Sequence, residues 1–146
     1  RRMDYSALGD TVNTASRLES QSKTYGVDIV IGPDTQARIP DLATMELDTI
    51  RVKGKTRGLK IHGLLGDGAL ARDPDFVAAR QTHRSMLDAF REQDWTTART
   101  LNAATRARGE RFALDVLCAL YDCRISAFEA QPPAADWDGV FDAAPK

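Results

Sequence analysis

Apolar and polar positions along the first 66 residues switch between the two-residue period of strands and the three-to-four-residue period of helices. Val12, Ala15 and Leu18 recur at three-residue spacing and predict the buried side of a helix. The predicted elements, in chain order, are a strand at 3–8, a helix at 10–24, a buried strand at 28–32, a short helix at 34–39, and a hairpin with strands at 43–52 and 59–65.

Turn-forming residues mark the ends of these elements. Gly26 is expected to close the first helix in a left-handed conformation, and Asp10 to cap its start. Pro40 is expected to end the short helix. The apolar spacing within residues 43–52 predicts a bulge or a break in that strand. Together these elements predict an α+β layer in which the long helix packs on one face of a sheet.

Residues 67–146 predict an all-α arrangement. A linker at 67–74 ends with Asp73 as a helix cap and Pro74 at the first helical position. Apolar residues at the 3.6 period then predict three helices, which begin near residues 74, 95 and 111. After the two prolines at 132 and 133, an extended tail carries Trp137 and Phe141, which are expected to fold back on the helices.

The histidine and the two cysteines of this helical part are interpreted as structural residues. His83 lies on the apolar stripe of its helix and is expected to be packed or half-exposed, not a base or a metal ligand. Cys118 and Cys123 are five residues apart in a helical pattern with no second pair of ligands nearby. They are expected to be reduced core residues.

Length and charge narrow the classes of function. A chain of 146 residues with 42% hydrophobic residues suits one ordinary domain or two very small ones. Residues 1–66 carry 10 basic and 8 acidic side chains, and residues 67–146 carry 10 and 13. Neither half is basic enough to indicate a nucleic-acid partner. No apolar run approaches the roughly 18 residues of a membrane span.

We therefore expect no membrane contact from this segment and a cytoplasmic location. The chain begins at Arg1 without an initiator methionine or a signal peptide, which favours a fragment of a longer protein. Any membrane anchor of that protein is expected to lie upstream.

Three side chains are candidates for phosphate chemistry. Asn13 and Arg17 lie four residues apart on the predicted helix, so both leave the same side one turn apart. An amide beside a guanidinium suits a sugar oxygen and a phosphoryl group on which negative charge develops. Lys53, beside Gly54 at a strand end, is a suitable point charge for the β- and γ-phosphates. A solvated helix face and an ordinary charged hairpin tip stay open as structural interpretations.

Two stretches resemble the class III nucleotidyl cyclases, the family that makes cyclic AMP or cyclic GMP. Residues 5–13 read YSALGDTVN, residues 15–19 read ASRLE, and residues 51–55 read RVKGK. The signatures occur in the family's order, joined by residues 25–32. The resemblance implies that residues 1–66 are the C-terminal part of a ferredoxin-like catalytic domain that converts ATP to 3′,5′-cyclic AMP and pyrophosphate.

The resemblance also implies a role for four residues. Asn13 corresponds to the asparagine that orients the ribose, and Arg17 to the arginine that stabilises the α-phosphate in the transition state. Lys53 aligns with the triphosphate-binding lysine, whereas Lys55 has no assigned role. Ser6 occupies the position that helps to select the base. Because its hydroxyl can both accept and donate a hydrogen bond, Ser6 alone does not decide between ATP and GTP. ATP is favoured, and GTP stays an alternative.

By the same resemblance, the reaction needs two divalent ions, Mg or Mn, bound by a pair of aspartates that lie outside this chain. Asp4 and Asp10 do not correspond to them. The family builds its sites between two protomers, one supplying the aspartates and the other the asparagine, arginine and lysine. The segment is thus expected to supply half of a homodimer site, to hold no metal itself, and to be inactive alone.

Residues 89–98 resemble the central turn of a tetratricopeptide repeat, and residues 67–146 are therefore interpreted as a tetratricopeptide-like helical tail. Because stable arrays need about three repeats, this tail is expected to lean on the cyclase part or on a dimer partner. Three functions stay open: a catalytic cyclase segment, a cyclase-like regulatory domain that binds nucleotide without turnover, and a helical protein-interaction module. The presence of both Asn13 and Arg17 favours the first.

Overall fold

The computed structural model describes residues 18–51 and 57–142. These residues form an α+β structure, as the sequence pattern predicts. The elements are α2 (Ser22–Tyr25), β1 (Val30–Ile31), α3 (Pro33–Arg38), β2 (Ala43–Arg51), β3 (Leu59–Gly66), α4 (Gly68–Ala71), α5 (Pro74–Arg91), α6 (Trp95–Arg108), a 3-10 helix (Glu110–Phe112), α7 (Asp115–Ala130) and β4 (Phe141–Asp142).

The sheet is mixed, with strand order β1-β3-β2-β4. β2 and β3 form the predicted antiparallel hairpin, and β1 pairs antiparallel with the other edge of β3. The register of the hairpin shifts between Glu46 and Asp48, which confirms the predicted bulge. β4 pairs in parallel with the end of β2, a contact that joins two segments about ninety residues apart in the chain.

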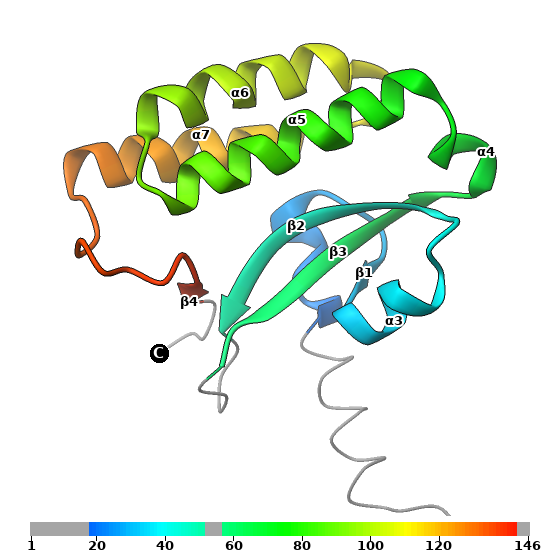
Figure 1. Cartoon of the computed structure of the whole chain (residues 1–146), viewed down its shortest axis with the longest axis horizontal. Helices are drawn as coiled ribbons and strands as arrows, with labels where there is room; N and C mark the ends of the chain where they lie inside the picture. The colour runs from blue at the N-terminus through cyan, green and yellow to red at the C-terminus, as the bar shows by residue number, and fades with distance from the viewer. Residues whose placement is uncertain (1–17, 52–56, 143–146) are drawn as a thin grey trace, which may run out of the picture.

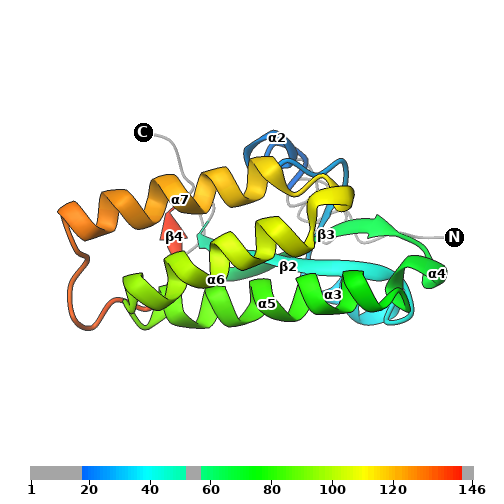
Figure 2. The ribbon, with the colours of Figure 1, turned by 90° about the horizontal axis from the view of Figure 1, so that it is seen from above.

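Helices α5, α6 and α7 cover the hairpin from one side (Figure 1). In that view α6 is uppermost, and α5 and α7 lie closer to the sheet. Seen from above, the three helices run side by side (Figure 2). The helical layer thus rests on β2 through α5 and α7, with α6 as its outer member.

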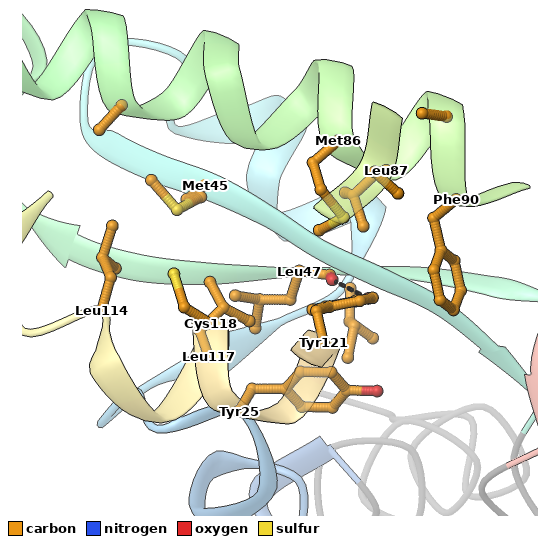
Figure 3. Close-up of a cluster of buried hydrophobic side chains, with 14 of the residues drawn as sticks. Tyr25, Met45, Leu47, Met86, Leu87, Phe90, Leu114, Leu117, Cys118 and Tyr121 are labelled. Atoms are coloured by element: carbon orange, nitrogen blue, oxygen red, sulfur yellow. Dashed lines mark hydrogen bonds between the residues drawn. The ribbon is translucent and has the colours of Figure 1, made fainter. Parts of the chain in front are cut away.

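The hydrophobic core lies between β2 and these helices. Met45 and Leu47 of β2 face Met86, Leu87 and other side chains of α5 and α7 (Figure 3). Residues 43–48 of β2 are all buried, so both of its faces are covered. The core therefore includes side chains from both halves of the chain.

Helical side chains also cover backbone oxygens of β2. The Tyr121 hydroxyl on α7 donates a hydrogen bond to the Leu47 carbonyl at 2.7 Å, the dashed line in Figure 3. The Arg80 guanidinium on α5 donates to the Thr44 carbonyl at 3.3 Å. A buried carbonyl without a partner would cost free energy, so these bonds stabilise the contact between the helical layer and the sheet.

The caps predicted within the described residues are confirmed, whereas the strand predicted at 3–8 and the Asp10 cap lie outside them. Gly26 ends α2 with φ of 74°, and its N–H donates to the Ser22 carbonyl. Asp73 caps α5 through the Asp75 N–H, and Pro74 occupies the first turn. Asp94 caps α6 in the same way through the Thr97 N–H. Pro33 opens α3, which ends at Arg38 before Pro40.

Three element predictions need correction. The helix predicted over 10–24 is interrupted, within its described part, by a turn at residues 20–21. The strand predicted as buried at 28–32 is a two-residue edge strand, and Ile29 beside it is 48% exposed. The predicted linker at 67–74 contains α4, because the Asp67 carboxylate accepts from the Ala69 and Leu70 N–H groups.

The third long helix and one cysteine also differ from the expectation. α7 begins at Asp115, not at residue 111, because Ala113 adopts a left-handed conformation with φ of 59°. Val116, predicted on the apolar side, is 50% exposed. Cys118 is buried as expected, but Cys123 is exposed; both are free thiols.

The C-terminal tail folds back, as predicted. Trp137 packs against Phe90 and Phe128, with ring centroids 5.7 and 5.3 Å away. Its indole N–H donates to the Val140 carbonyl at 3.2 Å. These contacts bring the tail across the ends of α5 and α7, and they lead into β4.

Gly26→Ala is expected to destabilise the fold by about 2 kcal/mol or more, because alanine is disfavoured at positive φ. An added Cβ would also lie 2.4 Å from the Val116 Cβ. Gly32→Ala is the matched control, since its nearest contact would be an ordinary 3.6 Å to Leu18. Chemical denaturation measures both free energies of unfolding. Equal values for the two variants would contradict the assigned role of Gly26.

Candidate functional site

The four residues to which the sequence assigns chemistry, Ser6, Asn13, Arg17 and Lys53, lie outside the described residues. Convergence of an amide, a guanidinium and an ammonium group on one nucleotide therefore stays a prediction. The described residues next to them show what holds the two segments from which these side chains extend.

Leu18, which follows Arg17 directly, is anchored in the core. It is 5% exposed and lies against Gly32 at the start of α3. Its carbonyl accepts a hydrogen bond from the Gln21 N–H at 3.0 Å. Because a buried side chain has few alternative positions, Leu18 fixes the point at which the segment carrying Asn13 and Arg17 joins the described core.

The strand end that precedes Lys53 is held by the C-terminal tail. Arg51 pairs in parallel register with Asp142 of β4. Its guanidinium also lies 2.8 Å from the Asp138 carboxylate and 3.8 Å from that of Asp142. Lys53 is two residues further on, so the base of its segment depends on residues near the other end of the chain.

A buried polar network lies between β2, α2 and α7. The Arg124 guanidinium donates to the Asp48 carboxylate at 2.6 Å, and the Tyr25 hydroxyl donates to the same oxygen at 2.7 Å. Arg124 also donates to the Tyr25 hydroxyl oxygen at 3.2 Å. The second carboxylate oxygen of Asp48 accepts from the Thr49 N–H at 2.7 Å. All the charges of this network are thus matched inside the protein.

Aromatic rings enclose the same guanidinium. Its central carbon lies 3.6 Å from the ring centroid of Phe141 in β4. The rings of Tyr121 and Tyr25 follow at 5.3 and 5.4 Å. Cation–π attraction is strengthened when the cation is removed from water, and Arg124 is only 7% exposed.

The electrostatics of the network favour a structural role. Burial, reinforced by the negative charge of Asp48, raises the pKa of Tyr25 above its ordinary value. Burial likewise raises the pKa of Tyr121 well above its ordinary value. Both hydroxyls therefore keep their protons near neutral pH, and the network joins three elements without supplying a base.

The sequence interpretation did not identify this network. A signal was present: Arg124 shares the helical stripe of Tyr121 and Phe128, at spacings of three and four residues. An arginine on an otherwise apolar face requires a buried partner. That partner, Asp48, lies 76 residues away in sequence, so only the folded structure shows the pairing.

A pocket of about 440 Å³ opens between the end of α2, β3, α4 and the 3-10 helix. Its walls include Val27, Leu65 and Phe112, with Asp28 and Arg111 as charged members. Arg111 is already paired with two carboxylates of the α5 N-terminus. No surplus positive charge is left on that side chain to attract a phosphate.

The described residues show neither a group of metal ligands nor a helix that could span a membrane. Within 18–51 and 57–142, no three or more His, Cys, Asp and Glu side chains are grouped so as to hold a metal ion. In the same part of the chain, no helix has the length and apolar character needed to cross a bilayer.

Comparison with known proteins finds two adenylate cyclases. The chain is 38% identical over 66 residues to "Adenylate cyclase 1" of Rhizobium meliloti (strain 1021), a stretch of 44% of this chain and 10% of that protein. It is 34% identical over 65 residues to "Adenylate cyclase" of Anabaena cylindrica, or 42% of this chain and 13% of that protein. The alignments thus span about a tenth of the length of these relatives.

These similarities support an adenylate cyclase-related region within the chain. No family model matches the sequence. No solved structure matches it either.

Asp48→Asn is expected to destabilise the protein by about 3 kcal/mol, because it leaves the buried Arg124 without a counter-charge. Glu129→Gln is the matched control: it removes a carboxylate from the exposed pair with Arg99 and is expected to cost less than about 1 kcal/mol. Urea denaturation provides both values. A cost for Asp48→Asn no greater than that of the control would show that the buried pair does not stabilise the fold.

Stability is expected to fall in mild acid through His83. Burial, with a further contribution from the positive charge of Arg91, lowers its pKa to about 4. In the unfolded chain the imidazole has a pKa of about 6.5. Between the folded and unfolded pKa values the unfolded state binds more protons, so stability rises with pH. The contribution of neutral His83 to the free energy of unfolding is fully present above about pH 6.5, and about 3 kcal/mol of it is lost at about pH 4.

The measurement is the free energy of unfolding between pH 4 and 7 for the wild type and for His83→Leu. The difference between the two proteins should change with pH in this window. A pH-independent difference would contradict the assignment, because other acid-sensitive groups are common to both proteins.

Proposed function

We propose that this chain is a segment of a class III nucleotidyl cyclase that converts ATP to 3′,5′-cyclic AMP and pyrophosphate. The observation that carries the proposal is the similarity to two adenylate cyclases over 66 and 65 residues. Residues 1–66 would form the C-terminal part of a ferredoxin-like catalytic domain, and residues 67–146 a tetratricopeptide-like helical tail. The names of both relatives favour ATP over GTP.

The chemistry is an intramolecular displacement. The ribose 3′-hydroxyl oxygen attacks the α-phosphorus, the bond to the bridging oxygen of pyrophosphate breaks, and the hydroxyl proton is lost. Asn13 would orient the ribose, and Arg17 would balance the charge that develops on the α-phosphoryl oxygens. Lys53 would hold the β- and γ-phosphates, and Ser6 would contact the base.

The contacts of the described residues fit a positioning function for the two segments. Leu18 is buried immediately after Arg17, and Arg51 is held by Asp138 two residues before Lys53. A transition-state contact loses its effect when the side chain is displaced by about 1 Å. Anchors this close to Arg17 and Lys53 would limit such displacement.

The remaining parts of the site would come from outside this segment. Divalent ions, Mg or Mn, would polarise the 3′-hydroxyl and the triphosphate, bound by aspartates beyond this chain. The described residues hold no group of ligands suited to them. In the proposed homodimer, the partner protomer would supply those aspartates, and the isolated segment would be inactive.

Arg17→Ala in the longer protein that contains this segment is expected to lower cyclic-nucleotide production about a hundredfold, or about 3 kcal/mol, through loss of one transition-state contact. Lys53→Ala should chiefly raise the KM for ATP. Lys55→Ala is its matched control, two residues away with the same change of charge. It should leave the rate of cyclic-nucleotide production and the KM for ATP near wild type.

Product formation from ATP and from GTP is followed separately for each variant. Wild-type rates in Arg17→Ala would refute the transition-state role. Formation of cyclic GMP alone would contradict the adenylate cyclase proposal and favour a guanylate cyclase. Nucleotide binding without product, in a protein that retains the metal-binding aspartates, would favour the regulatory domain.

A further inference from the structure

A second pocket lies where α3, the β2–β3 hairpin and α5 meet. Its volume is about 200 Å³, comparable to roughly seven water molecules at about 30 Å³ each. We call it the basic pocket. Its polar lining consists of Gln36, Thr44, Glu46, His62, Arg80, Gln81 and Arg84.

The lining is rich in hydrogen-bond donors, and both of its cations are guanidinium groups that can only donate. Two guanidinium groups, two side-chain amides, a hydroxyl and an imidazole can donate into it. Glu46 is the one carboxylate among the described lining residues, and it is 8% exposed. A ligand that only accepts hydrogen bonds would complement this surface.

The charge of Glu46 is already neutralised. Its carboxylate oxygens lie 3.0 Å from Arg91, 3.6 Å from Arg84 and 4.0 Å from Lys60. Arg80 adds a fourth cation at the pocket wall. Three cations paired with one carboxylate, together with Arg80 in the lining, leave a local excess of positive charge.

The two arginines of the lining differ in mobility. Arg80 is held in place, because it donates to the Thr44 carbonyl at 3.3 Å and lies 5.3 Å from the ring centroid of Phe76. The Arg84 side chain is 63% exposed and lies 3.6 Å from the Glu46 carboxylate. Arg80, which is held in place, and Arg84, which is more exposed, can both contact a single anion.

We propose that the basic pocket binds a phosphate-type oxyanion, either free inorganic phosphate or the phosphate group of a phosphomonoester. Arg80 and Arg84 supply charge-assisted hydrogen bonds to its oxygens, and the amides of Gln36 and Gln81 supply neutral ones. The residues that carry this inference all lie in the described part of the chain. This inference goes beyond the proposed cyclase function and does not depend on it.

His62 reports occupancy of the pocket. Burial lowers its pKa; nearby Lys60 and Arg84 lower it further, whereas Glu46 opposes the shift. An anion beside the imidazole would favour its protonated form and raise this pKa. The chain has two histidines, and His83 is fully buried, so the His62 resonance can be assigned with one His62→Gln variant.

The test is an NMR titration of His62 in the 146-residue chain with sulfate, which keeps a constant charge across the pH range, against sodium chloride at equal ionic strength. Sulfate should raise the His62 pKa, and chloride should not. Titration with inorganic phosphate at fixed pH then gives the affinity. No shift of the His62 resonance with either oxyanion overturns the proposal.

Arg84→Gln is expected to weaken phosphate binding about tenfold, the value of one charge-assisted hydrogen bond. Arg108→Gln, the same change at an exposed arginine of α6 outside the lining, is the matched control and should bind like wild type. Glu46→Gln should act in the opposite direction and tighten binding. Equal losses in Arg84→Gln and Arg108→Gln would indicate general charge attraction and overturn the site.

AMP and adenosine separate the two sources of the phosphate group. AMP binding more tightly than inorganic phosphate, with adenosine inert, identifies a phosphomonoester site; equal affinities identify a site for the phosphate group alone. Arg17→Ala should leave the His62 shift unchanged. Cyclase activity is measured in the longer protein and the His62 shift in the 146-residue chain, so failure of the proposed function and failure of the basic pocket are observed separately.

Discussion

The buried ion pair between Asp48 and Arg124 is the contact on which the architecture of the described residues depends. It joins the centre of β2 to α7, and through Tyr25 and Phe141 it also reaches α2 and β4. Removing two charges from water is unfavourable, so such a pair persists only where further hydrogen bonds and close packing compensate. Here the Tyr25 hydroxyl, the Thr49 N–H and three aromatic rings supply that compensation. The network therefore specifies one relative placement of the sheet and the helices.

β2 is the element that both halves of the chain share. Its buried residues 43–48 pack against α5 and α7, and its carbonyls at Thr44 and Leu47 accept from helical side chains. Glu46, Leu47 and Asp48 reach different partners because the bulge changes which side chains face each layer. The expectation that the helical part leans on the first half of the chain is met by these contacts. They also bring the C-terminal tail to Arg51, close in sequence to the lysine of the proposed nucleotide site.

Charge is distributed unevenly around this strand. On the α7 side, Asp48 and Arg124 balance one another inside a shell of aromatic rings. On the α5 side, Glu46 is paired with three cations, and Arg80 lies beside Arg84 in the lining of a pocket. The first arrangement suits a permanent structural contact, because every polar atom has a partner within the protein. The second suits a ligand, since its donors outnumber its acceptors.

Features that depend on a few neighbouring residues could be predicted from the sequence: the Gly26 cap, the Asp73 and Pro74 helix start, the β2–β3 hairpin and its bulge. They follow from backbone sterics and from hydrogen bonds closed within one or two turns. The chemistry of Asn13, Arg17 and Lys53 was likewise inferred from residue type, spacing and resemblance, and these residues lie outside the described part. Only the tertiary structure decided the pairing of Asp48 with Arg124, the parallel contact of β4 with β2, the length of the edge strand at Val30 and the cations around Glu46. Each of these joins residues distant in sequence or depends on how the layers pack, and no local pattern encodes which distant side chain will arrive.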